Sequence, residues 1–561
     1  MRLSLRFLLN VLATVAVVFH GNGADFSFDL SEGSEAPKHE MRGAWLATVY
    51  GIDWPSKQGA TAAVAEEQRR ELREILDVLQ ASGINAVMFQ VRSMSDALYP
   101  SKFEPWSQWL TGARGAAPAK GWNPLEFAVA EAHARGMELH AWVNPFRLAN
   151  GAAPAAVRAA SGRAVFDPVG KGWVIAYGQT ERIKTAARGK GKKGKKGKKG
   201  KRTIAYTTKT KWTSILDPGN PEARRHIVDV CREIITDYDV DGLVFDDYFY
   251  PDRLPLGDGY DYSEWIEQTT PEGGGEPSMS QADWRRDNVA RTIAEVSEMV
   301  RKERPWVRFG VAPAGVGGGN GAATEPYGLR APEVGNDWMY DRIFCDPVRW
   351  LADGSVDYVS PQIYWACDHV TNPYEPIARW WADVAIYFGR HCYPSQKVLA
   401  LPAGAEAWGE QCREVEVNRH ASSGIGPGEI FYSSAHLSGK QAYGLGEALR
   451  SGVFEHPALM PVTPWKEAPN PGAVQQLVRK GNRLSWYPQP DMRYVVYAIP
   501  SEVGMLDAVS PDGANFATRY IQGIVYGHSF DLAPDKIKNH WFAVAPYDRY
   551  GNEWEPAIIG L

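Results

Sequence analysis

Short apolar runs alternate with segments of helical period from about residue 42 to residue 464. Eight of the runs are rich in β-branched and aromatic residues, which predicts strands at 43–49, 86–91, 138–143, 242–246, 308–312, 357–363, 397–401 and 429–433. Between them apolar residues recur three and four positions apart, as in Leu72, Ile75, Leu76 and Leu79, which predicts amphipathic helices. Eight strand–helix repeats predict an α/β protein with a (β/α)8 TIM barrel. An open doubly wound sheet is the alternative, because a sequence does not show whether a sheet closes.

The ends of the predicted helices carry their own signals. Asn123-Pro124 and Asn220-Pro221 each place a capping side chain before a proline at the first helical position. Gly83 and Gly136 follow the last apolar residues of two helices, where a glycine ends a helix well.

The pattern changes beyond residue 464, where apolar and polar residues alternate in short runs separated by Gly, Pro and Asp turns. This predicts a small C-terminal β-sandwich. The predicted organisation is a barrel at 41–465 and a sandwich at 466–561.

The first residues have the features of a secretory signal. Arg2 and Arg6 precede an apolar run at 7–19, and small residues follow at Gly21, Gly23 and Ala24. We therefore expect a signal peptide at 1–24, a linker at 25–40, and a mature protein without a transmembrane segment that is secreted or periplasmic. The apolar run is too short for a comfortable membrane span.

Charge is unevenly distributed along the chain. The net charge is −5, but residues 188–202 contain ten Lys or Arg separated by Gly, so the rest carries −15. This Lys/Gly-rich insertion lies in the long connection after the third strand and predicts a flexible cationic tether. Either it has no specific ligand or it contacts an anionic polymer such as cell-wall glycan; we expect no nucleic acid partner.

Neither a metal nor a cofactor is predicted. The five cysteines form no CxxC pair and are odd in number: Cys231, Cys345, Cys367, Cys392 and Cys412. One or two disulfides among the last four, or buried thiols throughout, are the alternatives.

The carboxyl ends of the predicted strands collect acids, amides and aromatics, and these ends carry the chemistry in such folds. Asp246 and Asp247 end the fourth strand, followed by Tyr248. Because adjacent strand residues point to opposite faces, we expect the two acids not to form one catalytic pair, and one of them to orient the site. The candidates for the second carboxyl group are Asp96 and Glu406, with Asp368 ranked behind them.

Sugars present hydroxyl groups and apolar C–H faces, so amides, charged groups and aromatic rings suit a carbohydrate site. The predicted substrate-binding residues share these properties: Arg92, His140, Asn144, Tyr248, Gln362, Tyr364, Trp365, Trp54 and Trp408. Structural roles are the alternatives for Asp96 as a turn residue and for His140 as a core residue.

Several motifs together resemble the secreted bacterial glycosyl-hydrolase-like family 10, which includes a division-associated glycosidase acting on peptide-stripped peptidoglycan strands. They are Arg42-Gly-Ala-Trp45, Gln90-Val-Arg92 with Asp96 and Tyr99, His140-Ala-Trp-Val-Asn-Pro145, Asp217-Pro-Gly-Asn-Pro-Glu222, Asp241 to Pro251, Asp283-Trp-Arg-Arg-Asp-Asn288 and Asp357 to Trp365. The resemblance implies a (β/α)8 barrel, action on bacterial polysaccharide and often a fibronectin type III-like sandwich behind the barrel. The tether and the segment Val311-Ala-Pro-Ala-Gly315 depart from the family pattern.

The predicted function is therefore an exported glycoside hydrolase acting on cell-wall glycan or a related polysaccharide through two carboxyl groups. A non-catalytic carbohydrate-binding or scaffold protein is the alternative. A wall ester or amide hydrolase is a weaker third hypothesis, since no metal or activated serine spacing supports it.

Overall fold

Eight parallel β segments pair in a closed ring in the computed structural model. The structure describes residues 36–160, 165–186, 204–398, 405–438, 444–509 and 515–560, without the side chains of 183–186, 204–206 and 405–407. The ring contains β1 (Met41–Leu46), β2 (Ala86–Arg92), β3 (Glu138–Val143), β9 (Gly242–Phe245), β10 (Arg308–Val311), β11 (Tyr358–Val359) with β12 (Gln362–Ile363), β13 (His391–Cys392) with β14 (Ser395–Lys397), and β15 (Gly428–Tyr432). Parallel pairing of β15 with β1, Met41 opposite Gly428, closes the ring. The predicted barrel is thus confirmed over the open sheet.

The sixth and seventh barrel strands are each interrupted by a proline. β11 pairs with β13 and β12 with β14, and Pro361 and Pro394 lie at the two breaks. Proline has no N–H to donate to a neighbouring strand, which explains both interruptions. The seventh strand, predicted at 397–401, lies earlier, at 391–397, because its proline hides the strand pattern. Residues 399–401 lie outside the described residues.

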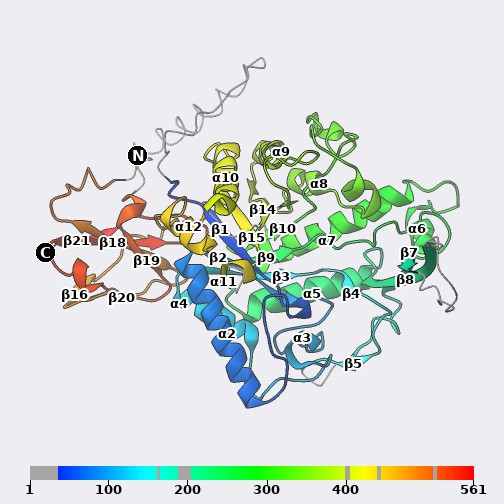
Figure 1. Ribbon diagram of the computed structural model, residues 1–561, viewed down its shortest axis with the longest axis horizontal. Coiled ribbons are helices and arrows are strands. Elements are labelled where there is room, and N and C mark those ends of the chain that lie inside the picture. Colours follow the sequence, from blue (N-terminus) through cyan, green and yellow to red (C-terminus); the bar gives the residue numbers. More distant parts are fainter. Residues whose placement is uncertain are drawn as a thin grey trace, which may run out of the picture. The chain divides into compact units, whose positions relative to one another are not determined.

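Helices follow every barrel strand and surround the ring (Figure 1). The longer helices are α2 (Ala62–Ala81), α4 (Pro124–Ala134), α5 (Pro221–Asp237), α7 (Gln281–Glu303), α9 (Tyr374–Tyr387) and α10 (Ala405–Ala421). The shorter ones are α3 (Gln108–Thr111), α6 (Tyr262–Thr269), α8 (Pro347–Ala352), α11 (Ala435–Ser438) and α12 (Leu445–Ser451). The side chains of Asn123 and Asn220 accept hydrogen bonds from N–H groups of the first turns of α4 and α5, which confirms the predicted caps.

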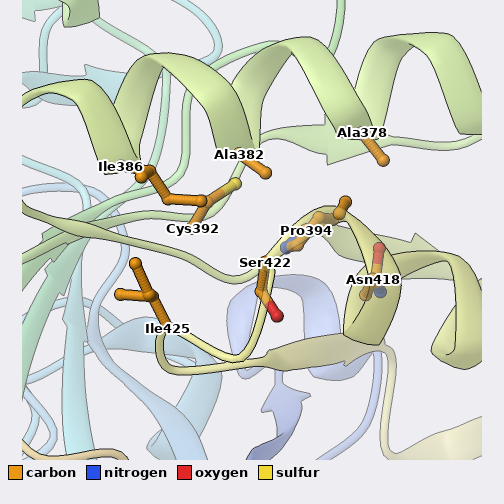
Figure 2. Close-up of a pocket in the computed structure, with 9 residues that line it drawn as sticks. Ala378, Ala382, Ile386, Cys392, Pro394, Asn418, Ser422 and Ile425 are labelled. Atoms are coloured by element: carbon orange, nitrogen blue, oxygen red, sulfur yellow. The ribbon is translucent and has the colours of Figure 1, made fainter. Parts of the chain in front are cut away.

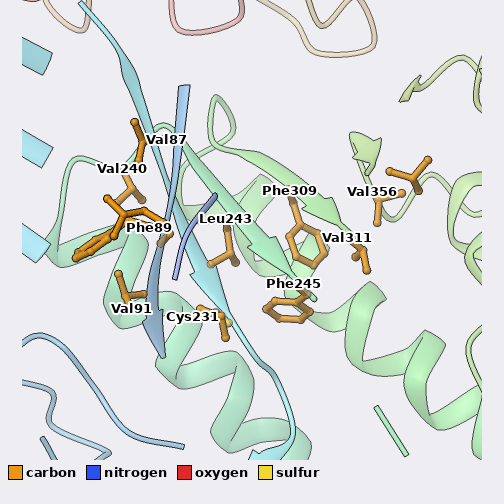
Figure 3. Packing of buried hydrophobic residues seen from close by; sticks show 14 of the residues in the cluster. Val87, Phe89, Val91, Cys231, Val240, Leu243, Phe245, Phe309, Val311 and Val356 are labelled. Atoms are coloured by element: carbon orange, nitrogen blue, oxygen red, sulfur yellow. The ribbon is translucent and has the colours of Figure 1, made fainter. Parts of the chain in front are cut away.

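Alternation along the strands divides the barrel core in two. Phe89 of β2 and Leu243 and Phe245 of β9 belong to an apolar cluster with Cys231 of α5 (Figure 3). The intervening residue Val244 belongs to a second cluster inside the ring. Because side chains alternate with period two, Asp246 continues the inward series and Asp247 the outward one.

A long two-stranded arm follows the third barrel strand. β7 (Val174–Ala186) pairs with β8 (Ile204–Leu216) along their whole length, and β8 also pairs with the short strand β4 (Arg147–Ala149). A small hairpin, β5 (Val157–Arg158) and β6 (Val165–Phe166), lies in the same connection. The Lys/Gly-rich tether at 188–202 lies outside the described residues, so its predicted polyanion contact stays a prediction.

Two antiparallel sheets form the C-terminal region. One contains β16 (Val478–Lys480), β17 (Arg483–Ser485) and β20 (Ser529–Asp531), and the other contains β19 (Ile521–Val525), β18 (Arg493–Pro500), β21 (His540–Tyr547) and β22 (Ala557–Ile559). Leu484, Val496 and Phe542 share an apolar cluster across the two sheets. Val495 and Tyr497, of opposite parity on β18, belong instead to the cluster of the barrel interior.

Buried ion pairs join the C-terminal strands to the amino ends of the barrel strands. Glu138 at the start of β3 lies 2.6 Å from Arg493 and 3.6 Å from Arg308. Burial raises the pKa of Glu138, but the two guanidinium charges outweigh it and hold the pKa at about 2. Asp241 pairs with Arg549 at 2.9 Å and with His133 at 2.8 Å. The amino-terminal face of the barrel is therefore covered by packed structure.

All five cysteines are free thiols, and four of them are buried, so the predicted alternative of disulfides among the last four is not found. Cys392 borders a cavity of about 10 Å3 between α9 and α10 (Figure 2), which has room for one water molecule and none for a sugar. Within the described residues, no helix has the length and apolarity needed to cross a membrane. The predicted signal peptide at 1–24 lies outside them.

Candidate active site

The carboxyl ends of the barrel strands surround a cavity of about 280 Å3, which we call the first cavity. Its walls come from seven of the eight strand ends and the loops after them: Trp45, Val49, Tyr50, Ile52, Gln90, Trp142, Arg147, Asn150, Asp246, Tyr248, Ala312, Gln362, Tyr364 and Tyr432. Asp246 is its one carboxylate among these residues. Aromatic rings, amides and a guanidinium make up most of the remaining wall, which suits a carbohydrate ligand.

Asp246 is held from two sides by neutral donors. Asn144 Nδ2 donates to its Oδ1 at 2.7 Å, and Trp142 Nε1 donates to its Oδ2 at 3.1 Å. Burial raises the pKa of Asp246 above its ordinary value, and Arg147 and these two hydrogen bonds offset only part of that rise. Its carboxylate oxygens thus have fixed positions, with the charged form favoured by three neighbours.

Asp247 faces a second cavity of about 200 Å3, which we call the second cavity. The residues around it are Asp247, Ala314, Gly315, Val316, Asn336, Trp338, Gln362, Tyr364 and Trp365. Burial and the neighbouring negative charge of Asp246 raise the pKa of Asp247 to about 7. A carboxyl group with this pKa carries a proton through much of the neutral range.

The two cavities adjoin, because Gln362 and Tyr364 belong to both walls. Tyr364 stacks on Tyr432 with ring centroids 5.6 Å apart, and Gln362 Nε2 donates to the carbonyl of Ala312 at 2.9 Å. Asp246 and Asp247 therefore line different cavities, as their alternation predicts, but those cavities adjoin at Gln362 and Tyr364.

Arg147 and Tyr248 lie beside Asp246. The guanidinium of Arg147 lies 3.7 Å from the ring centroid of Tyr248, whose side chain is exposed. No described residue forms a hydrogen bond or an ion pair within 4 Å with this guanidinium, although Asn144 Oδ1 accepts from the Arg147 backbone N–H. Its donors are free for a ligand.

The structure does not bring Arg92 or Asp96 to either cavity, so their predicted substrate-binding and catalytic roles are corrected. A register shift between Gln90 and Arg92 turns Arg92 away from the mouth into a buried ion pair with Glu104 at 2.6 Å. Asp96 is buried in a turn, where its Oδ1 accepts from Ser93 and Met94 N–H groups. Both residues stabilise the loop after β2.

His140, Trp54 and Trp408 are likewise core residues rather than sugar contacts. His140 lies inside the barrel, bonded to Tyr358 and Glu138. Trp54 is fully buried and donates to the carbonyl of Gln68, and Trp408 is buried in the outer apolar cluster. The side chain of Glu406 lies outside the described residues, so its catalytic role stays a prediction.

The candidate residues that the structure gathers are Asp246, Asp247, Tyr248, Gln362, Tyr364 and Trp365, with Asn144 bonded to Asp246. Several wall residues were not predicted: Trp45, Gln90, Trp142, Asn150 and Trp338. Strand parity could have indicated Trp45, Gln90 and Trp142, because they share the inward face. Among the described residues, no group of three or more His, Cys, Asp or Glu is placed to hold a metal ion.

Comparison with known proteins points to one family. Residues 40–184 and 194–407 match the model of a family described as Glycosyl hydrolase-like 10. Glycosyl hydrolase YngK of Bacillus subtilis (strain 168) is 31% identical over 433 residues, which cover 76% of this chain and 74% of that protein. Glycosyl hydrolase DigH of Escherichia coli (strain K12) is 35% identical over 350 residues, covering 61% and 70%.

A solved structure, the PgaB (BpsB) glycoside hydrolase domain from Bordetella bronchiseptica, matches with a TM-score of 0.42 and 14% identity over 73% of this chain and 98% of that one. At this level of likeness, the assignment of the barrel rests on the strand pairing of this chain.

Proposed function

The chain is a glycoside hydrolase of the glycosyl hydrolase-like 10 family, and on this premise we propose that it cleaves bacterial cell-wall glycan, peptidoglycan strands in the first place. The observation that supports this proposal is the unlike pair of carboxyl groups in adjoining cavities. It reverses the expectation, drawn from the opposite strand faces of Asp246 and Asp247, that the two do not form one catalytic pair. The pKa of Asp247 is raised to about 7, while Trp142, Asn144 and Arg147 favour the charged form of Asp246 against the raising effect of burial. Glycosidic cleavage needs one carboxyl group of each kind.

In the proposed mechanism Asp247 donates its proton to the glycosidic oxygen while the bond from that oxygen to the anomeric carbon breaks. Asp246 supplies the negative charge opposite the anomeric carbon, by direct attack or by taking a proton from water. The water molecule gives its hydroxyl group to the anomeric carbon and its remaining proton to the carboxyl pair, which replaces the proton that Asp247 donated. Trp142 and Asn144 hold Asp246 in place through their hydrogen bonds.

Within the part of the chain that the structure describes, the guanidinium of Arg147 has no hydrogen-bond or ion-pair partner. This supports, as the substrate, peptidoglycan from which stem peptides have been removed. N-acetylmuramic acid then carries a free carboxylate, and a guanidinium binds a carboxylate through two parallel hydrogen bonds. We propose that Arg147 binds this group in the first cavity, where it lines the wall with Asp246.

Three further features belong to the same proposal. The protein is exported in this proposal, which agrees with the signal-like sequence at 1–24 and with a substrate in the cell wall. The two C-terminal sheets, of three and four antiparallel strands, support a fibronectin type III-like sandwich at 466–561 after a barrel at 41–465. The tether at 188–202 would add a contact to a polyanionic wall polymer.

The test is incubation of the purified protein with intact peptidoglycan, with peptide-free peptidoglycan and with neutral polysaccharides, followed by mass analysis of the products. We expect reducing sugars from peptide-free strands. Asp246→Asn and Asp247→Asn should each lower kcat by about 100- to 10,000-fold with glycan binding kept. Asp368→Asn is the matched control, because Asp368 is an exposed loop acid that lines neither cavity.

Binding of strands by the wild type without cleavage of any polymer would favour a carbohydrate-binding or scaffold protein. Cleavage of neutral polysaccharide alone would keep the glycosidase and reject peptidoglycan as its substrate.

A further inference from the structure

The second cavity has its own carboxyl group and its own aromatic walls. Asp247 is the carboxylate among the residues that line the second cavity, and Asp246 is the carboxylate among those that line the first. Gln362 and Tyr364 form the partition that both hollows share. A ligand that extends from the first cavity into the second would have Asp247 beside it where it passes Gln362 and Tyr364.

Two half-buried indoles face this hollow from different loops. Trp365 follows β12, and Trp338 belongs to the turn Trp338–Arg342 in the long loop after β10. Trp338 is fixed from two sides, because its Nε1 donates to Asp252 Oδ1 at 3.2 Å and its backbone N–H donates to Asn336 Oδ1 at 3.0 Å. Asp252 is held in turn by Arg342. The ring thus has a set position before any ligand binds.

The remaining wall is equally rigid. Gly315 lies against the sixth barrel strand so closely that a Cβ there would lie 2.2 Å from the carbonyl oxygen of Gln362. Trp381 Nε1 donates to the carbonyl of Gly315 at 2.7 Å, and Ala314 bridges to Gln362 in the sheet. A hollow lined by two indoles and by the amide of Asn336 combines the apolar surface and the hydrogen-bonding groups that a pyranose ring binds.

We propose that the second cavity binds the sugar unit on the leaving-group side of the bond that is cleaved, with Trp338 and Trp365 as its platforms and Asp247 at the glycosidic oxygen. This inference rests on the proposed function. The acid must touch the oxygen that joins the two sugars, so the hollow that it lines receives the departing one. The first cavity, which contains Asp246, then holds the sugar whose anomeric carbon reacts.

The consequence is that cleavage of a polysaccharide uses binding of sugars on both sides of the cleaved bond. A donor sugar with a minimal leaving group would occupy the first cavity alone. Its hydrolysis would not use Trp338 or Trp365.

The experiment compares the wild type with Trp338→Ala, Trp338→Phe and Trp365→Ala on two substrates. One is a tetrasaccharide from peptide-free peptidoglycan, and the other is the glycosyl fluoride of the donor sugar, whose leaving group is one atom. We expect Trp338→Ala and Trp365→Ala to lower kcat/KM on the tetrasaccharide roughly 10-fold or more, with the fluoride unchanged. Trp338→Phe, which keeps an aromatic face, should recover part of the loss.

Trp306→Ala is the matched control, because Trp306 is a half-buried indole at the amino end of β10 that lines neither cavity. Equal losses on both substrates, or no loss on the tetrasaccharide, would overturn the inference. Thermal melts of each variant identify losses that come from misfolding.

A binding measurement separates this inference from the proposed function. In the Asp247→Asn background, adding Trp338→Ala should weaken tetrasaccharide binding but leave donor monosaccharide binding unchanged, measured by calorimetry. If the wild type cleaves no glycan and this difference persists, the hydrolase proposal fails and the sugar site stands. If cleavage occurs and the difference is absent, the sugar site fails and the hydrolase proposal stands.

Discussion

At the scale of single residues, the environment of two adjacent aspartates decides what each can do. Both follow the same strand, yet Asp246 accepts hydrogen bonds from Trp142 and Asn144, while Asp247 lies beside the charge of Asp246 at a separate hollow. Like charges in proximity cannot both ionise cheaply, so the proton stays on the group with fewer donors. Sequence neighbours thus acquire different chemical roles.

Ionisation of Asp247 also links pH to stability. Its pKa is about 7 in the folded protein against 3.8 ordinarily, so the folded state favours the protonated form. The resulting stability is fully present below pH 3.8 and is lost as the pH rises through about 7. Asparagine does not ionise, so Asp247→Asn should raise Tm relative to the wild type at pH 8 and not at pH 4. Calorimetry at the two pH values checks this; an equal difference at both would contradict it.

The same pKa predicts the pH dependence of activity. If Asp247 is the acid, kcat/KM on peptide-free strands should fall as the pH rises above about 7, because the proton is then lost from the free enzyme. A rate profile across pH 4 to 9, with stability checked at each point, measures it. An activity that keeps rising above pH 8 would assign the proton to another group.

At the scale of elements, the barrel wall needs glycine where aromatic rings fill its interior. A Cβ at Gly310 of β10 would lie 2.2 Å from the ring of Tyr358, which is buried and bonded to His140. The interior is closely packed, so neither ring nor strand has room to move. The predicted role of His140 as a substrate contact was wrong for this reason: its layer belongs to the packed centre of the barrel, beneath the cavity.

Gly310→Ala should therefore lower the free energy of unfolding by about 1–3 kcal/mol, the usual cost of overpacking a core. Urea denaturation followed by circular dichroism measures it. Gly409→Ala is the control, because Gly409 lies on α10 with no atom within 4 Å of an added Cβ, and it should leave stability equal or higher. Equal effects of the two substitutions would contradict the packing argument.

At the scale of the whole molecule, residues 37–561 form one compact unit. The C-terminal sheet shares an apolar cluster with the barrel interior, and Arg493 and Arg549 reach carboxylates at the starts of β3 and β9. In barrels of this kind the amino-terminal face serves stability and the opposite face carries the chemistry. The C-terminal sheets thus complete the barrel at the end away from the groove.

Arg493→Leu should lower the free energy of unfolding by about 3–5 kcal/mol, because it leaves the buried carboxylate of Glu138 short of a partner. Denaturation of the full chain measures it. Arg483→Leu, which removes an exposed ion pair with Asp531, should have little effect. The pKa of Glu138 is lowered to about 2, so its stabilising contribution is present above pH 4.5 and is lost as the pH falls towards 2. Below pH 2 the difference between wild type and Arg493→Leu should therefore shrink.

Much of this protein follows from its sequence alone. Local rules suffice for strand and helix periodicity, for the caps at Asn123 and Asn220, and for the acids after Phe245, because each depends on residues a few positions apart. The tertiary structure alone decided which polar residues reach the groove. A register shift turned Arg92 out of the barrel interior, a proline hid the true seventh strand, and Trp338 came to the second cavity from a long loop. Such placements depend on contacts between distant segments, which no local pattern encodes, and the adjacency of the two cavities around Gln362 and Tyr364 is the clearest example.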